Sequence, residues 1–347
     1  MSWNKHGLKI QLDTCTYCNA KCPMCDRTDI NGLGKRSDLP LIQWTLDDFK
    51  KAFSPEDLKS IDHISFCPTH GDAMMSNYTK SMIEYIFEHN PICSVSVDTN
   101  GSIRDENWWW EFGLISKGGQ YNLRVIFDVD GITQEMHEKY RQGTNLQKVL
   151  NNMKAFSESK SKTQAQTIVF KHNQPYLKEI ENLVKQYGAT THQHTYTDRS
   201  FPKKNKFFNF TDENGIRQKL EKANEPINNK NYQKRILELT ENITCSWNKV
   251  NRISISYDGQ VHPCCFFSNP YDKKSQWFLN HPLIKSYMNY KDELNIFNYS
   301  LSEIISHKWF NDELSNNWID KTPVNQCIKH CSNKRILFRD YIPITPI

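Results

Sequence analysis

The sequence has no long apolar run, and this absence limits the classes of protein that it can encode. No stretch of its 347 residues approaches the roughly 20 consecutive apolar residues that a bilayer-spanning helix requires. The segment from Met1 to Gly7 is polar and lacks the apolar core of a secretory signal peptide. We therefore expect a cytoplasmic protein without a membrane partner.

A concentrated stripe of basic residues is also missing. The formal net charge is +5, and the most basic local run is the short segment Lys203 to Lys206. Such a run is more typical of a solvated face than of a nucleic-acid contact. Nucleic acid is therefore not an expected partner.

Cysteine, in contrast, is abundant. The chain has eleven cysteines, and in a reducing compartment a large and odd number indicates metal binding rather than disulfides. They fall mainly into two groups. One is Cys15, Cys18, Cys22 and Cys25, and the other is Cys245, Cys264, Cys265, Cys327 and Cys331.

The first group contains the motif Cys18-x3-Cys22-x2-Cys25, directly after the alternating run Leu8 to Leu12. That alternation predicts a strand with the cysteines at its carboxyl end. Three thiolates can hold a four-iron cluster and leave one iron open for another ligand. Zinc, with Cys15 as a fourth ligand, is one alternative, but structural zinc pairs usually lie a dozen or more residues apart. Disulfides are the other, and the missing signal peptide disfavours them.

Strands and helices alternate along the first two hundred residues. The predicted strands after the first are Ile61 to Cys67, Ile92 to Asp98, Leu123 to Phe127, Thr163 to Phe170 and Thr190 to Tyr196. Six such units predict an α/β fold, a partial (β/α)6 TIM-like barrel over 1–200 that stays open. The alternation then stops, and the Lys- and Asn-rich range 201–244 predicts a linker with a polar helix.

The spacing of Cys18, Cys22 and Cys25 and its place near the N-terminus resemble the radical S-adenosylmethionine (radical SAM) superfamily. The resemblance implies that the open iron of a [4Fe-4S] cluster binds the methionine moiety of SAM. It implies a one-electron donor of the flavodoxin or ferredoxin type. It also implies that a 5′-deoxyadenosyl radical abstracts a hydrogen atom from the substrate.

The same resemblance implies which residues contact SAM. Gly71 and Asp72 stand where the superfamily has a Gly-Gly-Glu-type turn that contacts the SAM amino group, although the pair alone is an ordinary Gly-Asp turn. Asn100 lies in a Thr-Asn-Gly turn that is common in the family, and Met24 lies inside the cysteine motif. These residues are assigned to the cofactor site.

Two further cofactor contacts are implied around the fourth strand. Peptide-modifying relatives have Ser-x-Asp-Gly there, and in this chain Asp128 takes the place of the serine. Arg141 follows about a dozen residues later and would pair with the SAM carboxylate, because a guanidinium fork suits a carboxylate. The alternative is a solvated helix arginine.

His192, His194 and Tyr196 alternate along the sixth predicted strand and therefore share one face. If that face lines the barrel interior, the three side chains orient the substrate or move a proton, and they are our candidate catalytic residues. The alternative is a set of polar residues on an edge strand.

The second cysteine group has the spacing Cys245-x13-Gly259-x4-Cys264, followed by Cys327-x3-Cys331. Asp258-Gly259 predicts a two-residue hairpin that brings Cys245 near Cys264. The pattern resembles the twitch extension, a short form of the SPASM domain, which is a small α+β iron-sulfur domain, here 245–347. The resemblance implies that the four cysteines hold a second [4Fe-4S] cluster. Cys265 is the rival of Cys264, and structural zinc is the alternative.

The resemblance implies oxidation or crosslinking of a peptide or protein side chain. The predicted barrel begins by Leu8, which leaves no N-terminal peptide-recognition domain and weakens that interpretation. The alternatives are dehydrogenation or rearrangement of a small polar metabolite such as an aminocyclitol or sugar, modification of a nucleotide or nucleic acid, and a non-enzymatic zinc-binding scaffold.

Overall fold

The largest element of the computed structural model is a mostly parallel, open sheet of eight strands. The structure describes residues 3–197, 201, 206–224, 243–272, 276–319 and 324–331. The strand order is β10-β9-β1-β2-β3-β4-β5-β6, and β1 to β6 pair in parallel with their sequence neighbours. These six strands are β1 Leu8–Leu12, β2 Ile61–Phe66, β3 Ser94–Thr99, β4 Leu123–Asp128, β5 Lys162–Val169 and β6 Thr191–Tyr196. The predicted partial barrel is confirmed.

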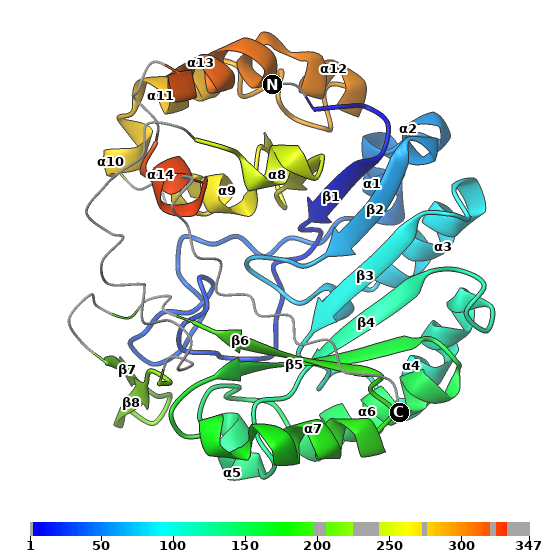
Figure 1. Cartoon of the computed structure of the whole chain (residues 1–347), viewed down its shortest axis with the longest axis vertical. Coiled ribbons are helices and arrows are strands. Elements are labelled where there is room, and N and C mark those ends of the chain that lie inside the picture. The colour runs from blue at the N-terminus through cyan, green and yellow to red at the C-terminus, as the bar shows by residue number, and fades with distance from the viewer. Residues whose placement is uncertain are drawn as a thin grey trace.

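Helices cover the outer side of this sheet, while the loop after β1 lies on the opposite side (Figure 1). The covering helices are α1 Leu46–Ala52, α2 Pro55–Lys59, α3 Thr79–His89, α4 Glu106–Gly113, α5 Gln134–Glu138, α6 Leu146–Glu158 and α7 Leu177–Gln186. Thr45 and Asp48 form a capping box at the start of α1. Among the described residues, no helix is long and apolar enough to cross a membrane.

The two faces of the sheet follow from the alternation of apolar residues along its strands. Leu123, Val125 and Phe127 of β4 are fully buried, and the ring centroid of Phe127 lies 4.9 Å from that of Trp109 in α4. Every second strand residue therefore packs under the helices. The residues between them, such as Asp128, face the interior of the barrel.

The C-terminal part of the chain extends this sheet. Strand β9, Arg252–Ile255, pairs in parallel with β1, and β10, Val261–His262, pairs antiparallel with β9. The predicted hairpin at Asp258-Gly259 is confirmed, and Gly259 has the positive φ of 81° that such a turn requires. The sheet thus continues across the boundary that the sequence predicts at residue 245.

One short helix precedes this hairpin and several follow it, and they pack at the β9 end of the sheet (Figure 1). They are α8 Ser246–Lys249, α9 Cys265–Asp272, α10 Gln276–Leu279, α11 Pro282–Asn289, α12 Leu301–Ser306, α13 Leu314–Ile319 and α14 Asn325–Cys331. A single turn of π-helix, Trp309–Glu313, precedes α13. Trp309 is fully buried among the aromatic rings of Phe267 and Tyr287.

The predicted linker over 201–244 requires a correction. Within it, residues 206–224 form an antiparallel hairpin of β7, Phe207–Thr211, and β8, Arg217–Glu221. The range 225–242, where the predicted polar helix could still lie, falls outside the described residues. Thr211 bridges to Asn31 in the loop after β1, so the hairpin lies against the cysteine loop. The basic run from Lys203 falls outside the described residues.

Candidate functional site

The loop that leaves the carboxyl end of β1 carries Cys18, Cys22 and Cys25. The Cys25 amide donates to the Cys22 carbonyl over 3.0 Å, which closes a tight turn within the motif. The Lys21 amide donates to the carbonyl of Gln142 over 2.8 Å and fixes the loop to the chain after α5. The three thiols are thereby held at the strand end where parallel barrels place their chemistry.

Buried apolar side chains pack against these thiols. Cys22 and Met24 are 7% and 4% exposed and belong to a cluster that includes Tyr140, Phe170 and Phe210 of β7. Burial raises the pKa of the Cys22 thiol to about 12, against the lowering effect of the Arg141 charge. Bound cationic iron favours the thiolate form that burial disfavours. Three neighbouring thiols packed against apolar side chains therefore fit the donor set of an iron-sulfur cluster.

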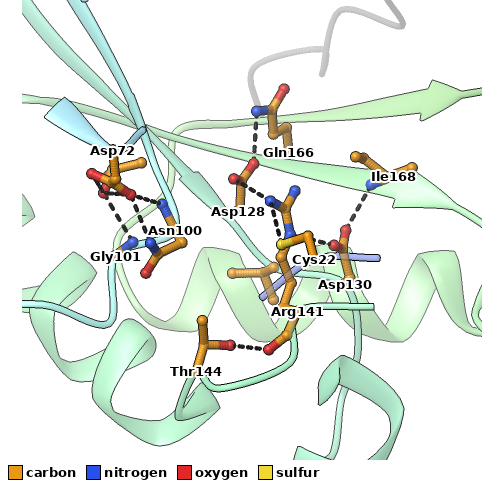
Figure 2. A network of polar contacts seen from close by, with 12 residues as sticks. Cys22, Asp72, Asn100, Gly101, Asp128, Asp130, Arg141, Thr144, Gln166 and Ile168 are labelled. Carbon is orange, nitrogen blue, oxygen red and sulfur yellow. Dashed lines mark hydrogen bonds and ion pairs between the residues drawn. The ribbon is translucent and has the colours of Figure 1, made fainter. Parts of the chain in front are cut away.

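Asp72, in the turn after β2, is a buried hydrogen-bond acceptor (Figure 2). Its carboxylate accepts from the Thr99 hydroxyl, the Asn100 amide and side chain, and the Met74 amide at 2.7–3.0 Å. A Cβ atom on Gly71 would lie 2.0 Å from the carbonyl oxygen of Cys15. The Gly-Asp turn thus joins the ends of β1, β2 and β3 into one rigid edge.

Asn100 lies between this edge and the cysteine loop. Its Nδ2 donates to Asn19 Oδ1 over 2.9 Å and lies 3.8 Å from Cys18 Sγ. Burial raises the pKa of Cys18 most strongly, and the charge of Asp72 raises it further. The predicted cofactor residues Asp72 and Asn100 are thus brought together beside Cys18.

Arg141 lies just after α5 and is enclosed by two carboxylates (Figure 2). Its Nη1 lies 2.8 Å from Asp128 Oδ2, and its Nε lies 2.7 Å from Asp130 Oδ2. The same Nη1 donates to Cys22 Sγ over 3.9 Å. Arg141 is therefore a buried residue that links the end of β4 to a cysteine of the motif.

The charge balance of this group was not foreseen from the sequence. The Asp130 side chain has no exposed surface, and its carboxylate also accepts a hydrogen bond from the Ile168 amide over 2.7 Å. Asp130 was not among the site residues predicted from the sequence. Its spacing of two residues from Asp128 at a strand end was the available signal. Burial raises the pKa of Asp128 to about 7, which the positive charge of Arg141 opposes.

The predicted catalytic face of β6 requires a correction. His192, His194 and Tyr196 pair in register with Ala165, Thr167 and Val169 of β5, and Ala165 pairs with Phe127 on the helix-covered face. His192 accordingly forms a hydrogen bond with the Thr167 hydroxyl at 2.8 Å. The charges of Glu181 and Lys185 on α7 lie close enough to act on its pKa. The three residues lie on the face under the helices, so the prediction that they face the interior is wrong.

The second cysteine group also converges. Cys245, Cys264, Cys327 and Cys331 line one apolar cavity between the hairpin, α13 and α14, together with Phe266, Phe267, Leu314, Trp318 and His330. The Thr244 amide donates to the Cys331 carbonyl over 3.0 Å, which joins segments that lie far apart in the sequence. Burial raises the pKa of Cys327 to about 12. Four thiols around one cavity fit the ligand set of a closed four-iron cluster.

Cys264 and Cys265 differ in their surroundings. Cys264 lines the cavity, and its neighbours include Cys327 and Cys331. Cys265 begins α9 and lies near Cys67 at the end of β2. Among the described residues, no three His, Cys, Asp or Glu side chains are placed to bind a single metal ion.

Comparison with known proteins gives structural matches and no sequence matches. No protein-family model matches the sequence, and no curated protein matches it. The structure of SuiB from Streptococcus suis superposes with a TM-score of 0.58 at 12% identity, covering 91% of this chain and 68% of that chain. SuiB bound to its precursor peptide SuiA gives a TM-score of 0.56 at 11% identity, covering 90% and 67%.

A second protein gives a similar result. The structure of anSMEcpe with bound AdoMet and the Cp18Cys peptide has a TM-score of 0.55 at 15% identity, covering 89% of this chain and 83% of that chain. AdoMet is S-adenosylmethionine, the cofactor that the cysteine motif implies. These likenesses extend over both the barrel and the C-terminal cysteine region. The chain therefore has the fold of radical SAM enzymes.

Proposed function

We propose that the protein is a radical SAM enzyme in which Cys18, Cys22 and Cys25 hold the catalytic [4Fe-4S] cluster. The observation that carries this proposal is the placement of three thiols beside a cluster of apolar side chains at the carboxyl end of β1. Structural neighbours of the same fold bind AdoMet. When bound, the cluster and AdoMet supply a 5′-deoxyadenosyl radical that abstracts a hydrogen atom from the substrate.

The residues around this site have distinct proposed roles. Asp72 and Asn100, which are bonded to each other beside Cys18, would contact the amino group of AdoMet, and Met24 would pack on the apolar side of the site. Arg141 is already paired with Asp128 and Asp130, so its proposed contact with the AdoMet carboxylate competes with two protein carboxylates. Its 3.9 Å contact with Cys22 supports a role in positioning that thiolate.

Cys245, Cys264, Cys327 and Cys331 are proposed to hold a second [4Fe-4S] cluster that accepts the electron left on the substrate radical. Such a step makes the overall reaction an oxidation. The convergence of these four thiols on one cavity supports this assignment over one that uses Cys265.

The proposed substrate is a peptide or protein side chain. Two neighbours of this fold were solved with peptides, SuiB with SuiA and anSMEcpe with Cp18Cys. β6 is the last strand in the order of the described sheet, which is the edge at which we propose that a chain segment enters the open barrel. A one-electron donor of the flavodoxin or ferredoxin type completes the proposed reaction.

The test uses anaerobically reconstituted protein and dithionite as reductant. We expect about eight irons per chain, four per cluster, and formation of 5′-deoxyadenosine from AdoMet. Cys18→Ala is expected to abolish this cleavage and to leave about four irons. Cys327→Ala removes a ligand of the other site only, so cleavage should persist while substrate oxidation is lost. Cleavage by Cys18→Ala at the wild-type rate would contradict the assignment of the first site.

A further inference from the structure

The amino end of the barrel interior carries a layer of cations that the proposed reaction does not use. Lys9 of β1 lies in register with Arg252 of β9 and with His63 of β2. Arg124 of β4 lies in register with Ser96 of β3, whose hydroxyl bonds His63 Nε2 at 3.1 Å. Because paired residues of parallel strands share a face, these side chains form one layer across five adjacent strands.

This layer faces the interior, away from the helices. The neighbours of Lys9 and Arg124 along their strands, Leu8, Ile10, Leu123 and Val125, are fully buried in the core under the helices. Lys9 lies near the amino end of β1, whereas the cysteine loop leaves the carboxyl end of that strand. The cationic layer and the cluster site are therefore at opposite ends of the barrel.

The cations of this layer lack carboxylate partners. Among the described residues, Lys9, Arg124 and Arg252 form no ion pair with Asp or Glu. The Nε atoms of Arg124 and Arg252 are buried and have no hydrogen-bond partner in the described part of the chain. The Arg252 guanidinium lies 4.7 Å from the ring centroid of Trp247, a contact with the aromatic face that supplies no hydrogen-bond acceptor for Nε.

Without a negatively charged partner, this layer of cations lowers the stability of the folded protein. Half-buried like charges repel one another at reduced dielectric, and a buried N–H without an acceptor loses its solvation. His63 is neutral near pH 7, because burial lowers its pKa to about 4. The charges of Arg124, Arg252 and Lys9 lower the pKa in the same direction. A bound oxyanion removes both costs, and guanidinium groups bind phosphate oxygens in a bidentate way.

We propose that the amino end of the barrel is an anion site in which Lys9, Arg124 and Arg252 bind a small oxyanion of the phosphate class. Lys162, in register with Arg124 on β5, adds a cation at the rim. By binding Arg252 of β9, Lys9 of β1 and Arg124 of β4, the ion bridges these three strands across the barrel interior. It thereby stabilises the sheet at the end away from the chemistry.

The test is calorimetric titration of reconstituted protein with orthophosphate, with chloride used to hold the ionic strength constant. We expect saturable binding of one phosphate per chain. Arg124→Gln and Arg252→Gln should each weaken the affinity about tenfold or more, because each removes a charged hydrogen-bond donor. Lys148→Gln, an equal charge change on the exposed face of α6, should bind phosphate like the wild type.

A second readout does not depend on the variants folding. Phosphate should shift the imidazole NMR signals of His63 in the wild-type protein, with the same midpoint as the calorimetric curve. Adenosine 5′-monophosphate in place of orthophosphate distinguishes a phosphate carried on an organic group from the free ion. Absence of saturable binding by both ligands, or equal binding by Arg124→Gln and Lys148→Gln, would overturn the proposal.

Discussion

Arg141 illustrates how single residues shape this site. It is a buried cation next to Cys22, and two buried carboxylates flank it at 2.7 Å and 2.8 Å. The desolvation of these charges is compensated only while all the partners remain. Loss of the central cation therefore costs more than loss of either carboxylate.

We predict that Arg141→Gln lowers the free energy of unfolding by about 3–5 kcal/mol, because it leaves Asp128 and Asp130 buried without their cation. Asp128→Asn should cost clearly less, since Asp130 still pairs with Arg141 over 2.7 Å. Urea unfolding of the reconstituted proteins measures both changes.

Lys154→Gln is the control for this comparison. It removes the cation of an exposed ion pair with Glu158 on α6, where both side chains are more than half exposed. Such a pair contributes about 0.3–0.5 kcal/mol at most. Equal losses for Arg141→Gln and Lys154→Gln would show that the buried group does not support the fold.

At the scale of elements, the packing of β6 under α7 determines what its histidines do. His192 is 5% exposed, and its ring bonds the Thr167 hydroxyl and His194. Burial, with the charge of His194, lowers the pKa of His192 to about 3. The residue is therefore a neutral part of the packed interface between sheet and helix.

This burial predicts a pH dependence of stability. A histidine that titrates near 6.5 when unfolded and near 3 when folded binds more protons in the unfolded state, so its contribution to stability is lost as pH falls below about 6.5. From pH 7.5 to pH 5 the loss for His192 is about 2 kcal/mol. His137, with its pKa lowered to about 3 by burial, adds a loss of the same sign.

The measurement is urea unfolding of wild type and His192→Gln at several pH values between 7.5 and 5. The variant should lose less stability on acidification than the wild type. Gln193→Asn changes the next residue of β6, on the opposite face, and should keep the wild-type pH dependence. If His192→Gln and wild type showed parallel curves, the titration assigned to His192 would be refuted.

The hairpin of β7 and β8 is another case in which packing overrode local composition. The range 201–244 is rich in Lys and Asn, which led to the prediction of a linker with a polar helix. Phe210 and Leu220 pack with Cys22 and Met24, and Thr211 pairs with the loop after β1. Local composition does not encode this packing, because the side chains that the hairpin meets come from a distant part of the sequence.

At the scale of the whole molecule, the C-terminal region completes the barrel sheet. β9 pairs with β1, and Trp3 before β1 packs edge-on against Phe310 with ring centroids 5.4 Å apart. Without β9, the edge of β1 would present unpaired amides and carbonyls to other chains. The two cysteine sites therefore belong to one cooperative structure.

We predict that a chain ending at residue 224 aggregates, because it exposes the edge of β1 and the apolar surface under the C-terminal helices. Anaerobic size-exclusion chromatography measures this directly. Full-length Cys245→Ser keeps β9 in place while it removes one thiol of the second site, and it should elute as the wild type does. A monodisperse truncated chain with native circular dichroism would show instead that the barrel folds alone.

The sequence alone determined the features that depend on local pattern. Alternating apolar residues predicted β1 to β6 with ends off by a few residues, and Asp258-Gly259 predicted the hairpin between β9 and β10. The spacing of Cys18, Cys22 and Cys25 predicted a cluster site at a strand end. These signals can be read from the sequence because a turn, the alternation along a strand and the spacing of metal ligands each depend on residues close together in the chain.

Only the tertiary structure decided which face of a strand looks inward and which charges meet. His192 and His194 alternate as interior residues would, yet their register with β5 places them under α7. Asp130 and Arg141 come from separate elements, and only the fold brings them to 2.7 Å. Lys9, Arg124 and Arg252 likewise form one layer because strands far apart in sequence pair in register, a long-range outcome that no local pattern encodes.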